Sequence, residues 1–473
     1  MIRPFLASIL ISACMPLSAA EPVLAPEVRQ TAVLLREKAF SGTRASEWAR
    51  SLADEVGPRP AGSDGDRAAV AWAVAKMKSI GLSNVRAERV KVTVWTRGVE
   101  TGEILSPHRQ KLFLTALGGS VATPPAGIEG AVFEAASLED LEARGAGARG
   151  KIVFFDKKME RRADGAGYGK AVDVRGKGPS AAAKLGAIAV VIRSIGTDHE
   201  RFPHTGSMTY EADAPKIPAA ALSIPDAELL ERMLRGGARV RIRVTLGCHD
   251  SPDAESANVV GEIPGTTRPK EIVLLGAHLD SWDLGTGAND DGAGCGIVLE
   301  AARLIGELPR SPARTIRVVL YANEEHGIEG GKAYREAHKA ELPLHAAAFE
   351  SDNGSGRPFA LQWLAGASAE PALREITEIL EPLGARSLLE GGSGGADISP
   401  LRADGVPQFA LRQDASLYFD WHHTANDTAD KIDRAGMDGN AAAAAAFAWV
   451  TASVEPAFEK IPADKREEEQ AKK

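Results

Sequence analysis

Residues 271–292 read EIVLLGAHLDSWDLGTGANDDG, and this stretch decides the fold. Its apolar run 272–275 is short and rich in β-branched residues, which is typical of a buried strand. His278 and Asp280 follow directly, and a glycine-rich turn leads to the acidic cluster 289–291. Open α/β sheets place their chemistry at the carboxyl ends of strands. The stretch therefore predicts a metal site at such an edge.

From residue 258 onward, strand, loop and helix patterns alternate, which indicates an α/β fold with a mainly parallel sheet. The expected strands are 271–277, 315–323, 344–350 and 406–411. The expected helices are 292–308, 330–340, 370–383 and 437–454.

The length of 473 residues favours about two structural units. The net charge of −8 argues against nucleic acid as a partner, because neutralising phosphates requires a basic face. The ten histidines are more informative, since imidazole is the commonest neutral metal ligand.

Residues 1–20 are interpreted as a secretory signal peptide, with a charged start, an apolar centre and small residues at the cleavage site. This stretch is too short to span a membrane, and no later segment is long and apolar enough. We expect a secreted or periplasmic protein. The segment 11–14 also resembles a bacterial lipoprotein box, so lipid anchoring through Cys14 is an alternative, although we favour a discarded peptide.

Two cysteines remain after the signal peptide, Cys248 and Cys295. A disulfide between them is one interpretation in an oxidising compartment. We favour a buried free thiol at Cys295, because it lies in a run of small residues.

The domain organisation is predicted from changes in composition and in the strand and helix patterns along the chain. A first part of the main domain is expected at 21–121, an inserted smaller α/β unit at 122–250, and the second part of the main domain at 251–460. Residues 461–473 are expected to form a charged, solvated tail.

Further ligand candidates follow the later strands. Glu324 and Glu325 follow the strand 315–323, Asp352 follows the strand 344–350, and a His-His pair comes near the carboxyl terminus. Imidazoles with several carboxylates and no thiolate suit zinc, cobalt or manganese, and their number suits two ions. One of the two adjacent glutamates can act as a general base while the other binds metal.

These motifs together resemble the cocatalytic-zinc aminopeptidase and glutamate carboxypeptidase family. The residues that carry the resemblance are His278-Leu279-Asp280-Ser281-Trp282, Asn289-Asp290-Asp291-Gly292, Glu324-Glu325, Glu350-Ser351-Asp352 and His423-Thr424. The resemblance implies a three-layer α/β/α zinc-exopeptidase domain, and the run 150–191 resembles a protease-associated domain within the insertion.

The resemblance also implies a role for each site residue. One zinc ion would be held by His278, Asp290 and Asp352, a second by the bridging Asp290 with Glu325 and His423, and Glu324 would be the general base. Asp280 would accept the N–H of His278 and fix its tautomer. His422 occupies a position that is Tyr in some relatives, where it stabilises the oxyanion, so an oxyanion or substrate contact is open for His422. Two adjacent imidazoles are not expected to face one metal, and we favour His423 as the ligand.

The activity that the resemblance implies is hydrolysis of short peptides or dipeptides by attack of a water bound to two zinc ions. Aminopeptidase, carboxypeptidase and dipeptidase specificity all stay open, and we also allow for a homodimer. The alternatives are a glutaminyl cyclase and a non-catalytic binding protein on the same scaffold.

Several residues have plainer interpretations. Asp291 is expected to cap a helix or to support a ligand, and His326 to belong to a loop. His204 is expected to be structural or part of a substrate wall. The glycine-rich run 391–395, followed by Asp397, fits a loop lining the site and a flexible connection equally well.

Overall fold

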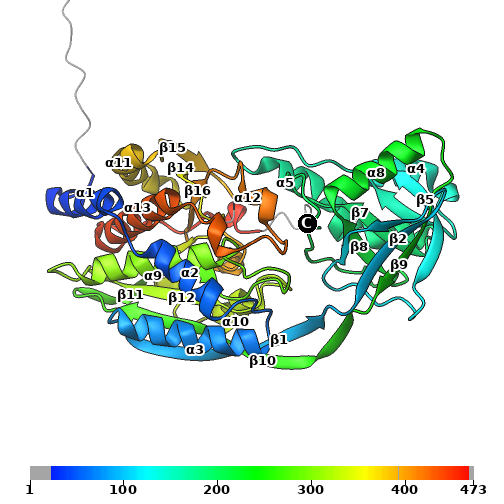
Figure 1. Cartoon of the computed structure of the whole chain (residues 1–473). Helices are drawn as coiled ribbons and strands as arrows, with labels where there is room; N and C mark the ends of the chain where they lie inside the picture. The colour runs from blue at the N-terminus through cyan, green and yellow to red at the C-terminus, as the bar shows by residue number, and fades with distance from the viewer. Residues whose placement is uncertain (1–22, 393, 468–473) are drawn as a thin grey trace, which may run out of the picture.

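Two eight-stranded sheets organise the chain (Figure 1). They are described in a computed structural model that covers residues 23–392 and 394–467. The predicted signal peptide with Cys14, and the last residues of the predicted tail, lie outside this range. Among the described residues, no helix is long and apolar enough to cross a membrane.

The first sheet has the strand order β1-β10-β12-β11-β13-β16-β14-β15. Its strands are β1 (Ser83–Thr96), β10 (His249–Ile263), β12 (Arg314–Tyr321), β11 (Arg268–His278), β13 (His345–Glu350), β16 (Gln408–Gln413), β14 (Pro358–Leu364) and β15 (Ser387–Glu390). The central strands β12, β11, β13 and β16 are parallel, as the sequence predicts. Towards the two edges, β1 and β10, and β16 and β14, pair antiparallel, so the sheet is mixed.

Helices cover both faces of this sheet, because successive strand residues alternate between two cores. On β11, Val273 and Leu275 belong to the larger core, and Leu274 faces a smaller one. The larger core contains residues of α1 (Pro26–Ser41), α2 (Ala45–Glu55), α3 (Asp64–Ser79), α9 (Gly292–Gly306), α11 (Glu370–Leu380) and α13 (Arg434–Ser453). The smaller core contains residues of α10 (Glu329–Ala337) and of the 3-10 segment Ser399–Asp404.

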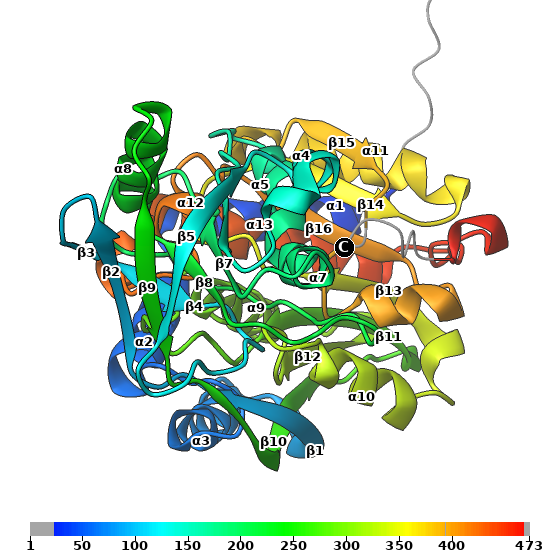
Figure 2. The same cartoon turned by 90° about the vertical axis from the view of Figure 1, so that its right-hand side faces the viewer.

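The second sheet has the order β3-β2-β9-β5-β6-β7-β8-β4. Its strands are β3 (Gln110–Leu112), β2 (Glu100–Ser106), β9 (Arg241–Leu246), β5 (Ile128–Ala135), β6 (Ile152–Phe155), β7 (Ala189–Arg193), β8 (Ala219–Leu222) and β4 (Leu114–Ala116). The helices around it are α4 (Leu138–Arg144), α5 (Ala166–Ala171), α6 (Asp173–Gly176), α7 (Gly178–Lys184) and α8 (Ile224–Arg235) (Figure 2).

This second unit starts at Glu100 and ends at Leu246, so its start lies before the expected residue 122. The chain leaves the first unit through β1 and returns through β10, which are paired from Ser83 with Glu262 to Thr96 with His249. The units are therefore joined by a two-stranded ribbon, which runs along the lower edge of the molecule in Figure 1.

The two described cysteines are buried and are not paired with each other. Cys248 Sγ lies 3.1 Å from the carbonyl oxygen of Ser120, and Cys295 Sγ lies 3.1 Å from that of His278. A disulfide between them is therefore absent, and the interpretation of Cys295 as a buried thiol is confirmed.

Candidate metal centre

The predicted site residues meet at the carboxyl edge of three adjacent parallel strands. β11 ends at His278, which is opposite Tyr321, the last residue of β12. On its other side β11 pairs with β13, with Gly276 opposite Glu350. This register places the residues that follow β12 and β13 beside His278.

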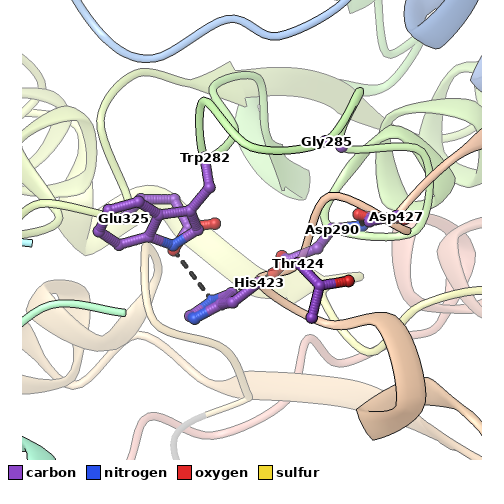
Figure 3. Close-up of a pocket in the computed structure, with 8 residues that line it drawn as sticks. Trp282, Gly285, Asp290, Glu325, His423, Thr424 and Asp427 are labelled. Atoms are coloured by element: carbon purple, nitrogen blue, oxygen red, sulfur yellow. Dashed lines mark hydrogen bonds and ion pairs between the residues drawn. The ribbon is translucent and has the colours of Figure 1, made fainter. Parts of the chain in front are cut away.

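Asp290 lies at the centre of the group. Its Oδ1 is 3.2 Å from His278 Nε2, and its Oδ2 is 3.2 Å from His423 Nε2. His278 Nε2 is also 3.7 Å from Asp352 Oδ1, and His423 Nε2 is 3.2 Å from Glu325 Oε2. The structure thus brings the other four predicted ligands around the carboxylate of Asp290. In Figure 3 a dashed line joins Glu325 and His423, and Asp290 lies to their right.

The loop that carries Asp290 is fixed from two sides. Asp427 accepts the backbone N–H groups of Asn289 and Asp290 at 2.8 and 3.0 Å. Arg59 is fully buried and donates to the carbonyl oxygens of Leu279, Thr286 and Gly287, the last two belonging to the turn. Sequence reasoning missed both residues, because a buried Asp and an Arg between two prolines carry no local signal of such a contact.

Asp280 has a broader role than predicted. Its Oδ1 lies 3.6 Å from His278 Nδ1, whereas its own carbonyl oxygen is closer, at 3.2 Å. The carboxylate accepts the backbone N–H groups of Glu324 at 3.0 Å and Glu325 at 3.3 Å. Asp280 therefore orients the start of the Glu-Glu loop as well as the imidazole. Asp291 accepts from Gly294 N as the cap of α9 and also from His278 N, in line with its predicted capping role.

The two adjacent imidazoles both lie close to Asp290, while the expectation that only one of them binds metal stays a prediction. His423 has a φ of 61°, and this left-handed backbone turns its ring to the same side as that of His422. The rings stack with centroids 3.6 Å apart, and His422 Nε2 lies 3.6 Å from Asp290 Oδ2. His423 is nearer to Asp290 and is also the one that reaches Glu325, which favours it as a ligand.

The pKa shifts around Asp290 indicate a buried group of charges that a bound cation would stabilise. Burial alone would lower the pKa of His278, but hydrogen bonds to Asp280, Asp290 and Asp352 outweigh it and raise that pKa well above its usual value. Burial also lowers the pKa of His422, which the neighbouring charge of His423 reinforces. Burial raises the pKa of Asp427 to about 7, and the charge of Asp290 adds to this effect.

A divalent metal fits this donor set. Two groups of side chains offer ligand atoms within 4.8 Å of one another, His278 with Asp290 and Asp352, and Asp290 with His422 and His423. Asp290 Oδ2 and Glu325 Oε1 are buried and have no hydrogen-bond partner in the described part of the chain, although an imidazole nitrogen lies close to the first. Imidazole and carboxylate donors without thiolate suit zinc. The orphaned oxygens are the atoms a cation would satisfy.

Other predicted residues lie around this group. The ring of His326 packs against Trp282 at 4.5 Å, and burial lowers its pKa to about 4. Gly395 and Asp397 lie against Glu350, whose carboxylate accepts the backbone N–H of Asp397 at 3.2 Å. Residues 394–397 therefore belong beside the site, at the end of β13, rather than in a detached connection.

Comparisons with known proteins point to one family. The sequence model described as "Peptidase family M28" matches residues 258–448. Carboxypeptidase Q of Mus musculus is 38% identical over 404 residues, which are 85% of this chain and 84% of that protein.

Solved structures agree with this result. The peptidase M28 precursor from Shewanella amazonensis SB2B is 47% identical, with a TM-score of 0.90, and the match covers 92% of this chain and 99% of that one. BSAP, a zinc aminopeptidase from Bacillus subtilis, is 22% identical with a TM-score of 0.62, over 89% of this chain and 97% of that one, which is a likeness of fold.

Proposed function

The chain belongs to peptidase family M28 and is a zinc exopeptidase, and from this premise we propose that it hydrolyses short peptides, including dipeptides, with Glu324 as the general base. The observation that carries the proposal is that four imidazole and carboxylate side chains gather around Asp290, and that Glu324 precedes one of them, Glu325, in the sequence. We further propose that the protein works outside the cytoplasm, on the basis of residues 1–20. That the protein forms a homodimer stays a prediction.

Two zinc ions would be held in this arrangement. His278 and Asp352 would bind one, Glu325 and His423 the other, and Asp290 would contact both. Zinc acts in such sites as a Lewis acid that polarises a carbonyl oxygen and makes water more acidic.

Glu324 supplies the proton transfer. Burial, together with the charges of Glu325 and Asp352, raises its pKa well above the usual value, although His278 opposes the shift. A carboxylate with a raised pKa accepts a proton more readily, which suits a general base. Glu324 would take a proton from the attacking water and deliver it to the amine that leaves the cleaved peptide bond.

The substitution Glu324→Gln tests this role. Glutamine has the same size but cannot take up the proton, so we expect dipeptide hydrolysis to fall by about a thousandfold while bound zinc is retained. Glu336→Gln is a matched control, because that side chain is 67% exposed on α10. Turnover by Glu324→Gln at the wild-type rate would refute the assigned base.

A peptide panel tests the substrate class. Free dipeptides are compared with N-blocked and C-amidated forms, and with a peptide that starts with Gln. We expect cleavage of the free dipeptides. Cleavage of N-blocked but not C-amidated peptides would exclude an aminopeptidase, and pyroglutamate formation without cleavage would indicate a cyclase.

A further inference from the structure

The segment His204–Ser207 of the second unit touches the loops that carry two of the predicted ligands. Thr205 N donates to the carbonyl oxygen of His423 at 3.0 Å, and Ser207 Oγ donates to the carbonyl oxygen of Glu325. His204 Nδ1 lies 2.7 Å from the carbonyl oxygen of His422. One short segment therefore contacts both residues that would hold the same metal ion.

The contact with His423 determines its tautomer. His423 Nδ1 lies 3.3 Å from the carbonyl oxygen of Thr205. A carbonyl oxygen only accepts hydrogen bonds, so Nδ1 must carry the proton. Nε2, which faces Asp290 and Glu325, is then left with the lone pair that a metal requires.

His204 anchors this segment within the second unit. Its side chain is 1% exposed, its Nε2 lies 2.8 Å from Asp198 Oδ1, and its backbone N donates to Ser194 Oγ at 2.8 Å. The ring fills the space beside Gly196, where a Cβ would lie only 2.3 Å from it. The ring is thus held by its own unit and donates from Nδ1 to the loop of the other.

The other half of the metal centre has no such support. His278 Nδ1 faces the carbonyl oxygen of Asp280, in the loop directly after its own strand. Within residues 23–392 and 394–467, the hydrogen bonds and ion pairs of His278 and Asp352 go to residues of the first unit.

We propose that the second unit completes one of the two metal positions by holding His423 in its metal-binding tautomer, with His204 as the positioning residue. This inference rests on the proposed two-zinc function. It predicts that damage to the His204 contact weakens the ion at Glu325 and His423 and leaves the ion at His278 and Asp352 unchanged.

Two substitutions separate the two bonds of the His204 ring. In His204→Gln the amide nitrogen lies near the former Nε2 and loses the bond to His422. In His204→Asn the amide nitrogen lies near the former Nδ1 and keeps the bond to the carbonyl oxygen of His422. We expect His204→Gln to lower the affinity for one of two zinc ions by about tenfold to a hundredfold, and His204→Asn to restore most of it.

The measurement is zinc binding per chain in metal-buffered solutions, with chelator competition, on the full chain. His199→Gln is the matched control, since it is the same change on a 69% exposed side chain of the same loop. Thermal unfolding of the metal-free variants reports any loss of fold, which a tautomer effect does not require.

The outcomes separate the two proposals. A wild-type chain that does not bind two ions would refute the proposed metal centre. A wild type with two ions and a His204→Gln variant with unchanged affinities, or with both ions weakened equally, would overturn the inference alone. If His204→Gln does not fold, Asp198→Asn takes its place, because it removes the charged partner on the other side of the same ring. The affinity of the same single ion must then fall. Unchanged affinities in Asp198→Asn would overturn the inference.

Discussion

The two halves of the metal centre are built in different ways. His278 and Asp352 lie at or just beyond the ends of β11 and β13, neighbouring strands of one sheet. Glu325 and His423 lie on loops, and the His204–Ser207 segment of the second unit binds the backbone of both. The first half is a product of strand pairing, whereas the second needs a contact between two units. Asp290 contacts residues of both halves, so strand pairing and the contact between the units both affect the same metal centre.

The largest effect is expected from Asp290→Asn, which removes the carboxylate that faces both halves. An amide nitrogen in place of one oxygen cannot bind metal, so we expect both zinc ions to weaken and hydrolysis to fall by more than about a thousandfold. Zinc content and dipeptide turnover check this. Asp253→Asn is the control, because its side chain is 54% exposed. If one ion stays at wild-type affinity, the halves do not share Asp290.

Acid is expected to destabilise the fold through His345, independently of metal binding. His345 begins β13 at the end away from the site. His345 is buried, accepts from Tyr334 at Nε2 and donates from Nδ1 to the carbonyl oxygen of Glu341, and burial lowers its pKa to about 4. Between pH 6.5 and pH 4 the unfolded chain binds a proton at this residue and the folded chain does not. Stability is therefore full above pH 6.5 and falls by about 3 kcal/mol as the pH drops to 4.

Urea unfolding of the metal-free protein from pH 4 to pH 7 measures this effect. In His345→Asn the contribution disappears, so the difference in unfolding free energy between wild type and variant should shrink by about 3 kcal/mol on acidification. A difference that stays constant with pH would show that His345 is not kept neutral in the fold.

The smallest effect is expected from Asp280→Asn, which sharpens the comparison because Asp280 serves both halves. Its carboxylate accepts from Glu324 N and Glu325 N and lies near His278 Nδ1. Asparagine keeps one acceptor oxygen, so we expect a loss of about tenfold in affinity for each ion. Chelator competition measures both affinities. Weakening of a single ion would assign Asp280 to one half.

The sequence predicts the sheet-built half well, because its signals are local. Short apolar runs followed directly by His278, Glu324 or Asp352 place these residues at strand ends, and parallel pairing brings the ends together. Their roles as ligands and base stay predictions, although the structure gathers them. The strands β14 and β15 were not predicted, since they contribute antiparallel and edge positions rather than strand ends with polar residues.

Glu325 of the other half also follows a predicted strand, but the support of this half could not be predicted, because it depends on contacts between distant residues. The bond from His204 to His422 spans 218 positions of the chain. The left-handed backbone at His423, which turns both rings to one side, has no signature in the run His422-His423-Thr424. The sequence predicts a start of the second unit at 122 instead of Glu100, because β3 and β4 have only three residues each and are too short to give a clear strand pattern.

The order of the elements along the chain has a consequence for assembly during synthesis. The second sheet is complete at Leu246, whereas every predicted ligand lies at or after His278. Domains fold as units, with the amino-terminal ones first during synthesis. His204 and Thr205 therefore precede the loop with His422 and His423 in the chain, and the sheet of their unit needs no strand after Leu246. The last predicted ligand along the chain is thus the one that an earlier segment, in a sheet already complete in sequence, contacts through Thr205.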